Sequence, residues 1–213
     1  MNYSPAIQIL ADEHDVILGV LEALETMAER ENVLPFPQDF YEKAFDFFPT
    51  FADKCHHAKE EGHLFPKLRE RGIPQDGGPI GCMLHEHDTG RAHVVAIREA
   101  LRATANNHAP AEALVRREAL AYAALLRQHI YKENEILFVM GDRVMTEQDK
   151  TEVLQKFNCA VHATLPAGSH EKYLALAREL RATAGLPAEY SADPDRVPPS
   201  PCGHGQCPEG VCG

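Results

Sequence analysis

Histidine and glutamate crowd into one short stretch, CHHAKEEGHLFP, at residues 55–66. Imidazole nitrogens and carboxylate oxygens together are ligands that suit first-row transition metals. A sparser second copy, HIYKENEILF, occupies residues 129–138. In each copy a histidine is followed by glutamate four residues later and then by Leu-Phe, so the sequence predicts two metal-binding segments. The two pairs are His56 with Glu60, and His129 with Glu133.

The register of the first copy has two interpretations. Residues four apart lie on the same face of an α-helix, about one turn or ~6 Å along its axis. His57 and Glu61 offer the same spacing, but on an α-helix they point about 100° away from the first pair. Aligning the Leu-Phe ends of the two copies favours His56 and Glu60. We keep His57 and Glu61 as the alternative.

Further histidines are placed to face these pairs. His14 lies on the first expected helix, and His85 and His87 lie on the third. At a rise of ~1.5 Å per residue, His14 is level with His56 if the first two helices are antiparallel. His87 is level with the histidine of the second copy by the same count. The predicted cluster comprises six ligands: His14, His56, Glu60, His87, His129 and Glu133.

This set of four imidazoles and two carboxylates suits transition metals better than Mg²⁺ or Ca²⁺. Clusters of histidine and glutamate on facing helices hold di-iron or di-manganese sites in bundle cores, where glutamates can bridge the two ions. Six side chains do not saturate two octahedral ions. We expect the remaining positions to take a bridging oxide or hydroxide, water, or a small ligand such as O₂ or NO.

Four long helices must carry these residues, because apolar residues recur at helical spacing and alternating strand patterns are missing. Ser4 followed by Pro5 is typical of a helix start, and Pro49 is expected to kink or break the second helix. The expected helices span residues 4–31, 37–72, 79–106 and 110–141. Short loops between them predict an all-α, antiparallel up-down four-helix bundle.

Two shorter helices, at about residues 146–158 and 169–184, are expected to pack on this bundle. The predicted organisation is a bundle over residues 1–145, additional helices over 146–184, and a flexible tail over 185–213, where Pro and Gly dominate. The tail holds four side chains of metal-binding type: Cys202, His204, Cys207 and Cys212. Their spacing matches no strong zinc template, so an unstructured redox-active or metal-collecting segment is expected.

The composition of the chain limits which partners it can bind and where in the cell it is expected. The net charge of −11 argues against nucleic acid or anionic lipid as the main partner. No apolar run approaches a membrane span, and the N-terminus lacks the pattern of a signal peptide. These features predict a cytoplasmic protein.

The remaining candidates are interpreted as ordinary structural residues. Four histidines at one level of a bundle core would each need a partner, or cost roughly 1–3 kcal/mol of desolvation, which singles out the predicted cluster. The other histidines are expected to be capped or solvated: His63, His93, His108, His162 and His170. Surface or outer positions are expected for Asp15, Lys59, Glu61 and Asp88, and core packing for Phe47, Phe48 and Phe51.

The order H…HxxxE…H…HxxxE, the phrase HHAKEEGHLFP, and GGPI followed by EHD resemble the hemerythrin-like, HHE cation-binding domains over about residues 7–141. The resemblance implies a non-haem di-iron bundle with bridging carboxylates, and it selects His87 over His85. The chain also resembles the C-terminal half of di-iron proteins that repair iron–sulfur centres after nitric oxide stress. It departs from them in two ways. Their N-terminal cysteine-bearing domain is absent, and the chain shows six candidate ligands, whereas the repair proteins have seven.

Two classes of function follow from this centre. The first is a protein that binds or senses O₂, NO or iron. The alternative is an enzyme of nitrosative or oxidative stress defence, which reduces NO or peroxide or repairs iron–sulfur clusters. An enzyme of this kind needs a redox partner and a proton donor, for which Tyr131 is the candidate.

Overall fold

The computed structural model describes residues 3–30, 36–104, 109–164 and 168–190, and every regular element in these ranges is helical. The predicted all-helical fold is therefore confirmed. The first half contains α1 (Pro5–Glu29), α2 (Gln38–Phe47), the π-helices η1 (Phe48–His57) and η2 (Glu60–Leu64), and α3 (Phe65–Glu70). The second half contains α4 (Pro79–Thr104), α5 (Ala109–Lys132), the π-helix η3 (Glu133–Leu137), α6 (Phe138–Val144), α7 (Glu147–Thr164) and α8 (Ser169–Thr183).

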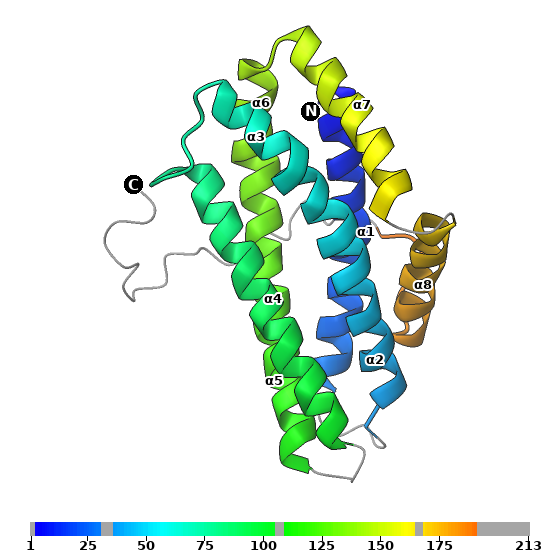
Figure 1. Cartoon of the computed structure of the whole chain (residues 1–213). Coiled ribbons are helices and arrows are strands. Elements are labelled where there is room, and N and C mark those ends of the chain that lie inside the picture. Colours follow the sequence, from blue (N-terminus) through cyan, green and yellow to red (C-terminus); the bar gives the residue numbers. More distant parts are fainter. Residues whose placement is uncertain (1–2, 31–35, 105–108, 165–167, 191–213) are drawn as a thin grey trace.

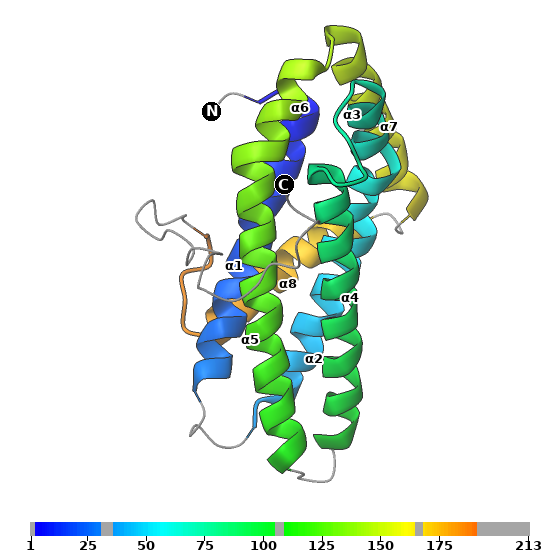
Figure 2. The same ribbon diagram turned by 90° about the vertical axis from the view of Figure 1, so that its left-hand side faces the viewer.

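These elements stack into four long columns that lie side by side, namely α1, α2 through α3, α4, and α5 through α6 (Figures 1 and 2). Each column runs back along the preceding one (Figure 1). The other two helices lie outside the columns, α7 against α1 and α8 against α1 and α2. The helix predicted to end near residue 158 is longer than expected, since α7 continues to Thr164.

Local sequence explains where the first column begins. Ser4 is the N-cap of α1 and Pro5 follows it, as predicted, because the missing N–H of proline costs nothing in the first turn. The apolar residues of α1 recur at helical spacing and are buried. They include Ile7, Leu10, Ile17, Val20, Leu21 and Leu24.

Two apolar clusters divide the interior. The larger one contains the predicted core residues Phe47, Phe48 and Phe51. The smaller one contains Phe65 and Phe138 and lies toward the α3, α6 and α7 end. Every predicted metal ligand is buried, and neither cluster includes any of them. Along the columns the ligands lie between members of the two clusters, as His14 does between Leu10 and Ile17, so the polar groups occupy a layer between two apolar layers.

The π-helices lie on the columns that carry the two histidine–glutamate motifs. Pro49 occupies the first turn of η1, where its missing N–H removes a helical hydrogen bond. A kink or a break was predicted at this position, and the structure has a widened π-helix instead. In a π-helix each N–H pairs with the carbonyl five residues earlier, and consecutive residues are less rotated about the axis. Adjacent side chains can then point to the same side.

Several sequence predictions lie beyond the reach of the described ranges. His108 and the tail residues Cys202, His204, Cys207 and Cys212 lie outside them, as does the side chain of His162. The three-part division of the chain stays a prediction. No described helix combines the length and apolar character needed to cross a membrane.

The start of α7 is tied to the end of α3 through one carboxylate. Asp149 accepts hydrogen bonds from the backbone N–H of Thr146 at 2.8 Å and from the Arg71 guanidinium at 2.7 and 2.8 Å. The Thr146 hydroxyl accepts from the Asp149 N–H at 3.2 Å, which completes a reciprocal helix cap. Arg71 and then Thr146 hold the pKa of Asp149 below its usual range.

We expect Asp149→Asn to be less stable than the wild type at pH 7, and the difference to shrink as the pH falls from 5 toward 3. A carboxylate with a depressed folded-state pKa stabilises the fold above its unfolded pKa of about 3.9 and loses that effect as the pH falls. Thermal melts across this range measure it. Asp76→Asn, at an exposed loop carboxylate, is the control. A stability difference that is the same at pH 7 and pH 3 would contradict the assignment.

Candidate metal centre

The six predicted ligands come together at mid-height of the columns, and each is at most 2% exposed. Glu133 lies between two histidines, with its Oε2 3.2 Å from Nε2 of both His14 and His129. Glu60 lies between the other two, with its Oε2 3.7 Å from Nε2 of His56 and 3.6 Å from Nε2 of His87. The predicted grouping of these residues is reproduced in the structure, and their role as ligands stays a prediction.

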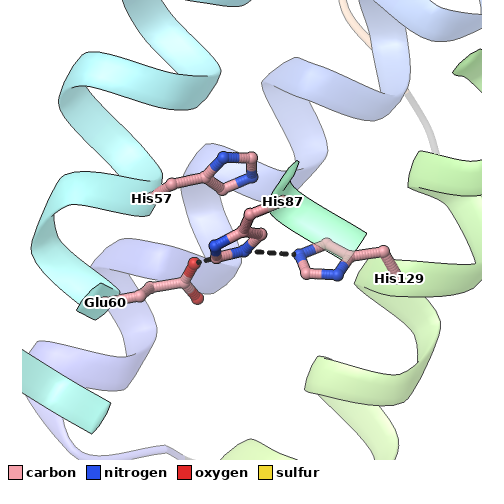
Figure 3. A group of neighbouring side chains, drawn as sticks. All are labelled: His57, Glu60, His87 and His129. Atoms are coloured by element: carbon pink, nitrogen blue, oxygen red, sulfur yellow. Dashed lines mark hydrogen bonds and ion pairs between the residues drawn. The ribbon is translucent and has the colours of Figure 1, made fainter. Parts of the chain in front are cut away.

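His57 joins this group as a seventh residue. Its ring stacks on that of His87 with centroids 3.8 Å apart, and Figure 3 shows both rings beside Glu60 and His129. The expectation that His57 points away from the cluster is wrong. That expectation assumed α-helical rotation, whereas His56 and His57 close the π-helix η1 and both face the interior.

The ligand atoms fall into two sets, each within 4.8 Å. The first set is His57, Glu60, His87 and His129, and the second is His14, His56, Glu60 and Glu133. Glu60 belongs to both sets. The arrangement therefore provides two adjacent positions for metal ions with one carboxylate common to them.

A ring of outer residues orients the histidines. The Nδ1 atoms of four of them lie within hydrogen-bond distance of an acidic or amide oxygen on a different column. The pairs are His14 with Asn134 at 2.8 Å, His56 with Glu13 at 3.0 Å, His87 with Glu61 at 2.7 Å and His129 with Glu86 at 3.1 Å. Such partners fix the tautomer that leaves Nε2 free to bind a metal.

Three cations complete this outer ring. Lys59 donates to Glu13, Lys132 donates to Glu86, and Arg91 donates to Glu61 at 2.7 Å. Burial raises the pKa of Glu13, but His56 and Lys59 outweigh it and lower the pKa. Lys59 is only 2% exposed, so of the two positions expected for it, surface or outer, it takes the outer one.

Glu61 and the two aspartates take the outer positions that the sequence suggested. Glu61 is a partner of His87 and is about one third exposed. Of the alternative pair, His57 therefore belongs to the inner group and Glu61 lies outside it. Asp15 and Asp88 are exposed, as predicted, and Asp88 pairs with Arg91 at 2.9 Å.

Burial keeps three of the histidines neutral. It lowers the pKa of His56 to about 4, with His14 adding to the effect. Burial followed by the neighbouring His87 lowers the pKa of His57 well below its usual value, and burial also lowers the pKa of His87. Neutral imidazoles carry the lone pair that a metal requires.

The pKa values of the two buried carboxyl groups are shifted in opposite directions. Burial and the nearby Glu133 raise the pKa of Glu60 well above its usual value, because two adjacent carboxylates cannot both be ionised in a buried site. Burial opposes ionisation of Glu133 as well, but His129 and His14 outweigh it and hold its pKa low. Burial lowers the pKa of His129, and Glu133 overcomes this and raises it to about 9. A bound cation would stabilise both carboxylates at once.

Buried polar atoms that form no hydrogen bond test whether the residues of this centre fit metal ions. Among the described residues, ten buried side-chain atoms make no hydrogen bond, and seven of them belong to this group. Each would cost roughly 1–3 kcal/mol without a partner. The seven are Nε2 of His14 and His56, Nδ1 of His57, and both carboxylate oxygens of Glu60 and Glu133. Their types and convergence fit two transition-metal ions.

We expect Glu86→Ala to weaken metal binding by about 10–100-fold, because His129 loses the acceptor that orients it. Glu99→Ala, on an exposed face of the same helix, is the control. Titration against a chromogenic chelator measures both affinities. Equal affinities for the two variants would show that the contact between Glu86 and His129 is incidental.

The remaining predicted side chains are distributed around the centre. Tyr131, the suggested proton donor, is 47% exposed and does not belong to the buried group. His93 is half-buried and bonds Glu118 at 2.9 Å. His170 of α8 approaches Glu13 and Cys55, but Lys59 already places a cation against Glu13 and lies 3.4 Å from the Cys55 sulfur.

The chain is similar to known proteins over the four columns that carry this centre. The model of the hemerythrin HHE cation-binding domain matches residues 6–140. An iron-sulfur cluster repair protein DnrN of Neisseria gonorrhoeae is 35% identical over 127 residues, which cover 52% of this chain and 78% of that relative. No solved structure gives a significant match. All seven inner residues lie within the matched range.

Proposed function

Because the chain belongs to the hemerythrin HHE cation-binding domain family, we propose that its buried histidine and glutamate cluster holds two iron ions. The observation that carries the proposal is the convergence of buried ligand atoms in two sets that share Glu60, several of which form no hydrogen bond. His57, His87 and His129 would hold one ion, and His14 and His56 the other. Glu60 and Glu133 would be the bridging carboxylates. The four columns would constitute the antiparallel bundle typical of the family.

The function that this centre supports best is the binding or sensing of a small ligand such as O₂ or NO in a stress response. Iron, when bound, supplies redox chemistry and open coordination positions for such a ligand. The chain itself orients the imidazoles through the outer ring and excludes water with the apolar layers on either side. The metal-binding part would be residues 1–145, with α7 and α8 as an outer cover.

A second function is favoured by the similarity to the iron-sulfur cluster repair protein. In that case the chain would act on damaged iron–sulfur centres, by supplying iron or by removing NO, and would need a redox partner. The buried cluster serves both functions, since both require iron held by neutral imidazoles and carboxylates.

An iron assay combined with absorption spectra tests the main proposal. We expect about two irons per chain after expression in iron-replete medium, and a spectral change on adding O₂ or NO. Protein that contains only zinc, or a single metal ion, would contradict the two-iron centre. Restored activity of an NO-damaged iron–sulfur enzyme on addition of the iron-loaded protein, but not of the chelated protein, would favour repair.

A further inference from the structure

A cavity of about 350 Å³ adjoins the metal centre on the side of η1, α4 and α5. His57 and His87 form part of its lining, so it reaches the group proposed to hold metal. Its volume corresponds to about twelve water molecules at ~30 Å³ each, far more than a diatomic ligand occupies. Pockets of roughly 300–1,000 Å³ are typical of sites for small organic molecules.

The walls of this cavity are mainly apolar and held in place. The Phe48 and Tyr122 rings pack edge to face with centroids 5.0 Å apart, and both are buried. Val95 is 56% exposed, so this part of the lining reaches the surface. The apolar lining residues are Phe48, Pro49, Val94, Val95, Tyr122 and Leu126.

Gly90 leaves room between the walls. A Cβ atom at this position would meet the Tyr122 ring at 3.5 Å and Leu125 at 3.9 Å, which are ordinary contacts. Gly90 lies on α4, where its helical backbone needs no glycine, so a larger side chain can be introduced there to fill the cavity.

The charges along the cavity favour an anion at its outer part. Two of the lining carboxylates are paired with cations, Asp53 with Arg91 and Glu86 with Lys132, whereas Asp46 accepts from the neutral Tyr173 hydroxyl and keeps its charge. Two exposed lining cations, Lys54 and Arg98, make no ion pair within the described ranges. Arg98 donates only to the Phe45 carbonyl, at 2.8 Å, so its charge is not neutralised.

We propose that this cavity binds an amphipathic organic monoanion, a carboxylate with an apolar chain of several carbons. Its carboxylate would lie at Lys54 and Arg98, and its apolar chain would run between Phe48 and Leu126 toward His57 and His87. The role of such a molecule as a substrate presented to the metal centre rests on the proposed function. Binding of the molecule in the cavity does not rest on the proposed function, because the contacts proposed for its carboxylate and its apolar chain require no metal ion.

Isothermal titration of the full chain with a graded series of compounds tests this proposal. We expect octanoate to bind at least tenfold more tightly than butanoate, because each buried methylene contributes to binding. Octan-1-ol should bind more weakly than octanoate, since it lacks the charge. Titrations are run on iron-loaded and on chelated protein. Failure of the proposed metal centre can then be distinguished from failure of the proposed carboxylate site.

Matched glycine variants locate the binding. Gly90→Leu should weaken octanoate binding at least tenfold by filling the cavity. Gly62→Leu, at a helical glycine with no atom within 4 Å of its would-be Cβ, should leave it unchanged. Arg98→Gln should weaken binding of octanoate and leave that of octan-1-ol unchanged, and this variant serves also if Gly90→Leu does not fold. Octanoate binding that is absent at millimolar concentration, or that survives in both Gly90→Leu and Arg98→Gln, would overturn the proposal.

Discussion

Glu60→Ala is expected to release nearly all bound metal, while His57→Ala leaves about one ion per chain. Glu60 is fully buried and belongs to both sets of ligand atoms, whereas His57 belongs to one. Loss of the shared carboxylate removes a ligand from each ion. It also leaves Glu133 as the one inner carboxylate to offset the charge of two cations. Metal analysis of purified variants by mass spectrometry measures the difference.

The control for this pair is His85→Ala, an exposed histidine on α4 that belongs to neither set of ligand atoms. It should keep the wild-type metal content. Circular dichroism should show that all three variants remain helical, because the apolar layers above and below the centre are untouched. Full metal content in Glu60→Ala would show that the shared-carboxylate arrangement is wrong.

Most of the centre could be predicted from spacing alone. The aligned Leu-Phe ends of the two motifs select His56 with Glu60 and His129 with Glu133, and helical rise brings His14 level with them. These inferences depend on periodicity along each helix, which sequence reports directly. The same logic predicted the helix starts at Pro5 and Pro79, which α1 and α4 reproduce.

The seventh residue, His57, was predicted only as an alternative to His56, because its position depends on a departure from α-helical geometry. Pro49 signals a disturbance in the second column, but it does not say that the helix will widen as far as His57. The adjacent pair of histidines was the available signal, since a helix that turns less per residue brings neighbouring side chains closer to one side.

Two glutamates of the outer ring, Glu13 and Glu86, were missed for a different reason. Glu13 and Glu86 each stand next to a predicted ligand in sequence, yet each bonds a histidine on another column. Contacts of this kind depend on how the columns pack and leave no periodic pattern. The sequence held a partial signal, because lysine follows the motif histidine by three residues in both copies, at Lys59 and Lys132. Both lysines neutralise the outer glutamates.

Removal of the metal is expected to lower the midpoint of thermal unfolding by about 6–16 °C while the protein stays helical. Binding to the native state alone adds about 3–4 kcal/mol at 100–1,000-fold excess over the dissociation constant. For a chain of this size, 1 kcal/mol corresponds to about 2–4 °C. The apolar layers persist without metal, since neither contains a ligand residue.

The physical cause of this loss can be separated from a general effect of the chelator. In metal-free protein Glu60 and Glu133 lie together in a buried site, and Glu60 must hold a proton that metal would displace. Melts of loaded protein and of verified metal-free protein measure the shift. The Glu60→Ala variant should melt at one temperature with or without chelator, because it has no metal to lose. Equal midpoints for loaded and metal-free wild type would mean that the buried carboxylates are stabilised by the protein alone, and the two-metal assignment would fail with them.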